Sequence, residues 1–282
     1  MPILTYSSEI WLADFKIDIR NISKTPIEKI QNMILKDILG VHRKASNVAV
    51  LCELGIYPLC IRMYELMFKY YSRLQDVDNS LNNEILKEAL IEDEKLSQKG
   101  NCPSIRKTLD NIKTLIRLES LSVSYEKFSN QLRKFFEKSI FDQLHYTKHS
   151  EEGKLLFFSK IYNYEFKIQE YLTYPLQKTL RSQLSKLRIS AHPLNIEVGR
   201  YCQPPIPRSN RYCKFCINEV EDEEHFLLNC NLYQDIRDKF EESLGHFDIE
   251  DIINPVNYQF TKYLCKYLDE CFKIRKENIS YH

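Results

Sequence analysis

Glycine is scarce in this chain, with 6 glycines among 282 residues. A loop that holds phosphate groups against its backbone needs several glycines close together, and the sequence contains no such loop. It also contains no nucleophile elbow and no paired-acid motif. A hydrolase or an NTPase is therefore not expected, and the sequence favours a binding or structural role.

Long apolar runs are also missing. No stretch approaches the roughly eighteen apolar residues that would span a bilayer, so no membrane association is expected. The opening residues, MPILTYSSEIWLADFK, lack a basic segment followed by an apolar run, so no signal peptide is expected either. The 9 cysteines then suit a reducing compartment. We expect an intracellular protein, either nuclear or cytoplasmic.

The residues that are present indicate a soluble, mostly α-helical protein. Hydrophobic residues make up 43% of the chain and charged residues 28%, which allows a sizeable core. The first helix is expected to begin at Pro26 and to end before Gly40, with an apolar face formed by Ile27, Ile30, Met33, Ile34 and Ile38. An apolar segment at 47–54 comes next, and further helices are expected at about 58–74, 83–97, 104–146, 151–174, 232–244 and 257–276.

Tyrosine and phenylalanine are frequent in residues 104–174. We interpret these aromatic residues as core packing, because aromatic side chains on a helical face are usually buried. The alternative is that some of them stack on nucleic-acid bases.

Residues 213–230 carry the strongest chemical signal, in the sequence CKFCINEVEDEEHFLLNC. The spacing C-x2-C-x8-H-x4-C provides three thiols and one imidazole, the ligand set of a closed, four-coordinate structural zinc site. The predicted ligands of one structural Zn²⁺ are Cys213, Cys216, His225 and Cys230. No ligand position is left for water, so we expect this metal to stabilise the fold rather than to catalyse a reaction. The alternative is four buried or free side chains without a metal.

Charge is unevenly distributed around this motif. From Leu176 to Cys216 the chain carries eight basic residues against Glu197 alone. From Ile217 to Glu250 it carries eleven acidic residues and two basic ones, so the net charge of +1 conceals a strong local contrast. The basic segment lies directly beside the predicted metal ligands, which favours an interaction with phosphate groups.

Three stretches together resemble one family. They are KDILGVHRKASNVAVLCELGIYPL at 36–59, LRISAHPLNIEVGRY at 187–201 and PRSNRYCKFCINEVEDEEHFLLNCNLYQDIR at 207–237. In this order they resemble the region that lies after the reverse-transcriptase core in non-LTR (LINE-type) retrotransposon polyproteins. The likeness is strongest over 187–237 and weak over 75–175.

The resemblance implies a helical thumb-like part, a helical linker and a Cys-Cys-His-Cys zinc knuckle that helps to hold element RNA and target DNA. Carried onto this chain, it implies a thumb-like region at 1–75, a linker at 76–186, a basic segment with the knuckle at 187–245, and a C-terminal helix at 246–282.

The chain also departs from that family. The polymerase palm of the family carries an aromatic-x-Asp-Asp motif for its catalytic metals, and this sequence contains no Asp-Asp pair. We therefore expect a C-terminal fragment or degenerate copy without polymerase activity, and not an enzyme.

The sequence predicts that RNA or DNA binds at the basic segment. The expected partner is a single-stranded nucleic acid or the element RNA. Guanidinium and ammonium groups would contact phosphates, and interleaved aromatic rings would stack on unpaired bases. The predicted contacts are Arg181, Arg188, Arg200, Arg208, Arg211, Lys214, Tyr212 and Phe215. The alternatives are a solvated basic face, or neutralisation of these charges by the acidic residues at 219–224. His192 is interpreted as a turn or core histidine and not as a second ligand.

A purely structural role is the second hypothesis. The zinc would then stabilise a lobe that docks on a reverse-transcriptase core and binds no nucleic acid itself. A mainly apolar exposed patch would favour that hypothesis, whereas a basic face with salt-dependent binding would favour the first.

Overall fold

The computed structural model describes residues 7–8, 25–75, 82–99, 102–150, 153–245, 248–249, 255 and 257–279. These residues are mostly α-helical, as the sequence predicts, and their only β-pairing is two isolated bridges. None of the described helices is both long and apolar enough to cross a membrane. The opening residues MPILTYSSEIWLADFK lie outside the described residues, apart from Ser7 and Ser8.

The chain forms two compact units. Unit 1 comprises Met1–Gln31 and Tyr57–Phe141, and unit 2 comprises Asn32–Ile56 and Asp142–His282. These limits differ from the four ranges implied by the resemblance, which remain a prediction.

Unit 1 is built from long helices around an apolar core. Phe68 of α4 (Leu59–Gln75) stacks on Phe128 of α7 (Tyr125–Ser150) with ring centroids 4.0 Å apart, and both rings are fully buried. This unit also contains α5 (Asn82–Gln98), α6 (Ile105–Leu115) and the beginning of α2 (Pro26–Leu39) up to Gln31, and α7 belongs to it up to Phe141. The expected helical region at 104–146 is therefore two helices separated by residues 116–124.

The first helix, α2 (Pro26–Leu39), begins at the predicted residue and is followed by Gly40, at φ 70°. Its buried face is not the predicted one: Ile30, Met33 and Ile38 are exposed by more than 40%. Glu28 and Gln31 are buried instead, because their side chains accept hydrogen bonds from the first N–H groups of α4, those of Cys60 and Leu59. The N–H groups at the start of α4 need hydrogen-bond acceptors, and this need, rather than the apolar periodicity, decides which face of α2 is buried.

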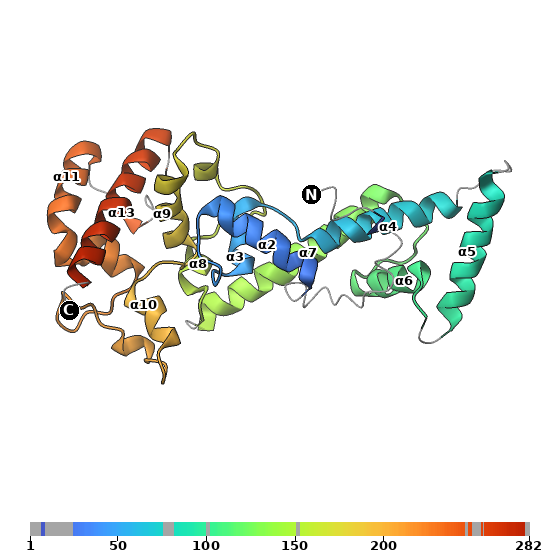
Figure 1. Ribbon diagram of the computed structural model, residues 1–282, viewed down its shortest axis with the longest axis horizontal. Coiled ribbons are helices and arrows are strands. Elements are labelled where there is room, and N and C mark those ends of the chain that lie inside the picture. The colour runs from blue at the N-terminus through green and yellow to red at the C-terminus, as the bar shows by residue number, and fades with distance from the viewer. Residues whose placement is uncertain are drawn as a thin grey trace. The chain divides into compact units, whose positions relative to one another are not determined.

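Unit 2 combines a few longer helices with a loop-rich segment. Its longest helix, α13 (Tyr258–Ile279), packs between α9 (Lys178–Arg188) and α11 (Gln234–Leu244), as Figure 1 shows. The other elements are α3 (Asn47–Leu54), α8 (Leu156–Ile161), η4 (Glu170–Leu172), α10 (Asn195–Val198), η5 (Gly199–Tyr201), η6 (Arg208–Asn210), η7 (His225–Asn229) and η8 (Asn231–Tyr233). Within the expected helix at 151–174, the described residues are helical only in α8 and η4.

Candidate metal centre

The first two cysteines lie on a tight turn. The Cys213 N–H donates to the Glu219 carbonyl at 2.7 Å, and the Glu221 N–H donates to the Arg211 carbonyl at 2.9 Å, which closes the turn at its base. Inside the turn, the Phe215 N–H donates to the Cys213 sulfur at 3.4 Å. This arrangement directs both sulfurs to one side, as the C-x2-C spacing predicts.

The second pair lies at the two ends of a single wide helical turn. Asp222 accepts a hydrogen bond from the His225 N–H at 2.9 Å and so caps this turn. The turn, η7, is a π-helix, and the Cys230 N–H donates to the His225 carbonyl at 2.8 Å. A five-residue turn therefore brings residues 225 and 230 to the same side.

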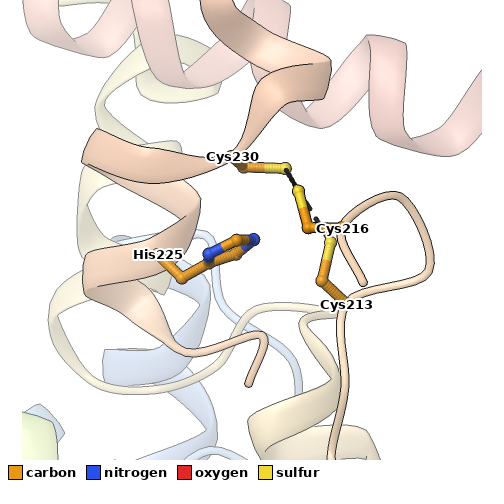
Figure 2. Close-up of side chains that lie close together, drawn as sticks. All are labelled: Cys213, Cys216, His225 and Cys230. Atoms are coloured by element: carbon orange, nitrogen blue, oxygen red, sulfur yellow. Dashed lines mark hydrogen bonds between the residues drawn. The ribbon is translucent and has the colours of Figure 1, made fainter. Parts of the chain in front are cut away.

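The four side chains converge. Figure 2 shows the three sulfurs grouped together with the edge of the His225 ring facing them. The Cys230 sulfur is 3.8 Å from both other sulfurs, and one ligand atom from each residue lies within 4.8 Å of all the others. Zinc–sulfur bonds of about 2.3 Å in a tetrahedron separate the sulfurs by about 3.8 Å. The geometry therefore suits a single tetrahedral metal ion.

Burial and polarity also fit a metal. All four residues are buried, and neither ring nitrogen of His225 has a hydrogen-bond partner among the described residues. A buried imidazole without partners costs free energy unless something binds it, and a metal ion would do so. The hydrogen bond with the Cys230 thiol, helped by the Phe215 N–H, lowers the pKa of Cys213, which favours the thiolate form that binds metals. In the same pair, the pKa of Cys230 is raised, chiefly by its hydrogen bond with the Cys213 sulfur.

The helices α11 and α13 hold the Cys230 side of the site. Arg237 donates to the carbonyls of Leu227 and Cys230, at 3.0 and 3.1 Å, and the Tyr267 hydroxyl donates to Leu227 at 2.7 Å. These bonds satisfy carbonyl groups at the end of η7. These bonds anchor η7, which carries His225 and leads into Cys230, to the core of unit 2.

Buried carboxylates hold the other side. Glu221 accepts from Arg275 of α13 at 2.8 Å, and Glu223 bonds both Ser190 and His192 at about 3 Å. His192 is buried and paired with a carboxylate, which agrees with its interpretation as a core histidine. Sequence reasoning missed Arg237, Tyr267 and Arg275, because nothing in their local sequence indicates burial.

The structure contradicts two of the predicted phosphate contacts. Arg188 is 2% exposed and forms an ion pair with Glu53 at 3.0 Å, beside the ring of Tyr171. Arg211 is buried and donates to the carbonyls of Ile206 and Ile196, at 2.9 and 2.6 Å. Both guanidinium groups stabilise the fold of unit 2, and neither faces solvent.

Arg181 and Arg200 are partly exposed. Arg200 forms an ion pair with Glu197 at 2.9 Å and donates to the Gly153 carbonyl at 2.7 Å. Arg181 approaches the Ile38 carbonyl at 3.5 Å. Each side chain keeps some exposed surface, but both also bond to other parts of unit 2.

The remaining predicted contacts are accessible. Lys214 and Arg208 are exposed, Tyr212 is 46% exposed, and Phe215 is half-buried. Two of the nearby acidic residues, Glu221 and Glu223, are buried and bond buried partners. Asp222 lies 4.0 Å from Arg208, and Glu219 and Glu224 of the same acidic segment are exposed. We call Arg208, Tyr212, Lys214 and Phe215 the metal-loop surface.

Comparison of the chain with protein-family models, with curated proteins and with solved structures finds no match. The resemblance of residues 36–59, 187–201 and 207–237 to non-LTR reverse transcriptases therefore remains a prediction from the sequence. The chemistry of the metal centre and of the surface beside it is the remaining guide to function.

Proposed function

We propose that this chain is a zinc-stabilised nucleic-acid-binding module, similar to the region after the polymerase core of non-LTR retrotransposon reverse transcriptases. The observation that carries the proposal is the buried cluster of three sulfurs and one imidazole beside the exposed metal-loop surface. A module of this kind binds RNA or DNA without catalysing its synthesis.

Zinc is the metal that this donor set favours. Soft thiolate ligands with one imidazole, in a tetrahedral arrangement, are typical of structural zinc sites. The four donors fill the coordination sphere, so no position is open for a catalytic water. In that role the ion supplies folding free energy to the turn around it.

Metal analysis tests the zinc assignment directly. The wild-type protein should contain one zinc per chain, and Cys216→Ser should contain much less. Cys202→Ser is the matched control, because Cys202 is partly exposed and outside the cluster. Equal zinc content in wild type and Cys216→Ser would overturn the assignment.

Nucleic-acid binding is supported by the composition of the metal-loop surface. Arg208 and Lys214 provide exposed positive charge, and Tyr212 provides an exposed ring that can stack on an unpaired base. Each phosphate neutralised on a single strand contributes about −0.7 to the slope of log K against log salt. Binding should therefore weaken as salt rises, with little sequence preference.

Fluorescence anisotropy with a short single-stranded RNA across a salt series tests the binding. The change Arg208→Ala with Lys214→Ala should weaken binding and flatten the salt slope by about one to two. Tyr212→Ala should weaken binding but leave the slope almost unchanged, because stacking releases no counterions. Lys95→Ala with Lys99→Ala, two exposed lysines of unit 1, removes the same charge as a control. No binding by the wild type at low salt would favour a docking lobe instead.

The absence of an Asp-Asp pair supports the non-enzymatic part of the proposal. Polymerases use such carboxylates to hold two metal ions that stabilise the attacking and leaving oxygens. Primer extension with Mg²⁺ or Mn²⁺ should give no product, and activity that persists through rigorous purification would contradict this.

A further inference from the structure

A second basic surface lies in unit 2, outside the basic segment at 176–216. Between α2 and α3 the chain reads GVHRKAS, with Gly40 ending one helix and Ser46 capping the next. Val41 and Ala45 are buried and fix the loop at both ends, whereas the three residues between them, His42, Arg43 and Lys44, are exposed. The fold thus directs three consecutive basic side chains to solvent.

Other parts of the chain add charge at the same place. Lys154 donates to the Lys44 carbonyl at 2.7 Å, and Lys36 donates to the Arg43 carbonyl at 2.8 Å. Arg200 donates to the Gly153 carbonyl, next to Lys154, at 2.7 Å. Four segments of the chain therefore place cationic side chains around one loop.

The local electrostatics agree with this placement. Partial burial of the otherwise exposed His42 ring lowers its pKa, and the positive charges of Lys154, Lys36 and Lys44 lower it further. Burial also lowers the pKa of Lys36, with added effects from Lys154 and Arg43. Cationic groups that depress one another's pKa create a positive potential that attracts anions.

Among the described residues, the acidic groups near this loop leave part of its positive charge unpaired. Asp37 lies 3.8 Å from Arg43, and both side chains are largely exposed. Glu197 forms an ion pair with Arg200. Within the described residues, Lys44 and Lys154 form no ion pair. Exposed pairs such as Arg43 with Asp37 are weak, so the charge remains available.

An exposed aromatic ring completes the surface. Tyr201 is 60% exposed, and the Lys154 ammonium lies 5.7 Å from its ring centroid. A ring presented to solvent beside several cations is the combination that binds single-stranded nucleic acid, since bases stack while phosphates pair with the cations. An acidic peptide would use the cations but not the ring.

We propose that Arg43, Lys44, Lys154 and Tyr201 form a second contact for single-stranded RNA or DNA, which we call the loop surface. The inference builds on the proposed nucleic-acid binding and extends it beyond the metal-loop surface. Hydrogen bonds connect the segments that carry the two surfaces, because the Ile206 N–H donates to the Gly199 carbonyl at 2.9 Å and Arg211 donates to the Ile206 carbonyl at 2.9 Å. A strand that crosses both surfaces would neutralise more phosphates than the metal-loop surface alone.

The test compares variants of the full chain with the same short single-stranded RNA. Arg43→Ala with Lys44→Ala removes two exposed side chains and keeps the carbonyls that Lys36 and Lys154 bind. We expect about ten- to thirty-fold weaker binding at 0.1 M salt and a salt slope flatter by about one to two. Tyr201→Ala should weaken binding at an unchanged slope. The Lys95→Ala with Lys99→Ala control should bind like the wild type.

The outcomes separate this inference from the proposed function. If the Arg208→Ala with Lys214→Ala variant loses affinity and the loop variant does not, the loop surface is overturned and the proposed function stands. If only the loop variant loses affinity, the loop surface stands and the metal-loop contact is wrong. If the wild type does not bind, both fall. If Tyr201→Ala binds like the wild type while the loop variant weakens, the surface is a general anion site, and the assignment to single strands is overturned.

Discussion

Unit 1 and unit 2 bury charge by different means. In unit 1 the buried carboxylate of Glu65 accepts from Ser129 and from Arg133, whose side chain is 42% exposed. In unit 2 both partners of two ion pairs, Arg188 with Glu53 and Arg275 with Glu221, are nearly inaccessible.

The two units also differ in the length of their helices. Unit 1 is held by helices of eleven or more residues, whereas the longest helix within residues 189–233 of unit 2 has five residues. Short elements expose many backbone groups that need partners, and unit 2 supplies partners with buried arginines, carboxylates and the candidate metal ligands. Unit 1 should therefore depend on apolar packing, and unit 2 on specific polar and metal bonds.

Removing a metal ligand should give the largest difference between the units. In Cys216→Ser the loss of a thiolate should unfold residues 208–237, because structural zinc contributes about 10 to 16 kcal/mol of binding free energy in small sites. Hydrogen exchange should show lost protection in that segment and unchanged protection in α4 and α7.

The control for this experiment is Cys202→Ser, which should leave both units protected. Chelation of the wild-type protein should reproduce the Cys216→Ser pattern. Full protection of residues 208–237 after metal removal would show that the polar bonds of unit 2 suffice without the ion.

Breaking the buried ion pair of unit 2 should have the next largest effect. Arg188→Met leaves Glu53 buried without its cation, and such a change typically costs about 3 to 5 kcal/mol. The double change Arg188→Met with Glu53→Met should recover most of this loss, because no charge is then left unpaired.

An exposed pair in the same unit provides the contrast. Arg43→Met, which breaks the pair with Asp37, should change the free energy of unfolding by less than about 1 kcal/mol. Urea unfolding measures all three variants. A cost for Arg188→Met as small as that for Arg43→Met would mean that unit 2 does not depend on its buried pairs.

The same contrast explains what the sequence could predict. Helices α2, α4, α5, α11 and α13 follow from local signals such as apolar periodicity, proline at the start or glycine at the end, whereas 47–54 was expected only as an apolar segment and is the helix α3. The convergence of Cys213, Cys216, His225 and Cys230 follows from spacing, which is local as well. The burial of Arg188 and Arg211 depends on partners distant in sequence, so a linear count of basic residues could not reveal it.

The buried face of α2 shows the same limitation. Its apolar residues predict one face, but the N–H groups at the start of α4 require acceptors, and Glu28 and Gln31 supply them. The loop surface was missed for a related reason: Lys44, Lys154 and Tyr201 come together only through the fold. A sequence pattern reports the preferences of one segment, whereas these features need two segments at once.

A pH-dependent effect should appear in unit 1. Burial raises the pKa of Glu28 from 4.5 to about 7, against the opposing effect of its bond with the Cys60 N–H. Because the folded state then holds this proton more tightly than the unfolded state, stability should fall as pH rises from about 4.5 to about 7 and then level off. The total loss should be about 3 kcal/mol.

Glu28→Gln should remove this dependence, since the amide oxygen still accepts from Cys60 and carries no charge. At pH 8 the variant should therefore be more stable than the wild type in urea unfolding. Glu84→Gln, at an exposed position of α5, serves as the control and should leave the pH profile unchanged. If the wild-type protein instead gained stability relative to Glu28→Gln as pH rises from 5 to 7, the raised pKa of Glu28 would be wrong.

The smallest expected effect tests whether the two units open independently. Ser46 caps α3 in unit 2 by accepting from the Ala49 N–H, and Ser104 caps α6 in unit 1 by accepting from the Lys107 N–H. Each serine-to-alanine change should cost about 1 kcal/mol, equivalent to roughly fivefold faster hydrogen exchange in the capped helix. Ser46→Ala should speed exchange in α3 and leave α6 unchanged, and Ser104→Ala should do the reverse. Glycine at either position should cost only a few tenths of a kcal/mol. If either alanine change accelerated both helices equally, the units would open together, and the contrast between them would not extend to their stability.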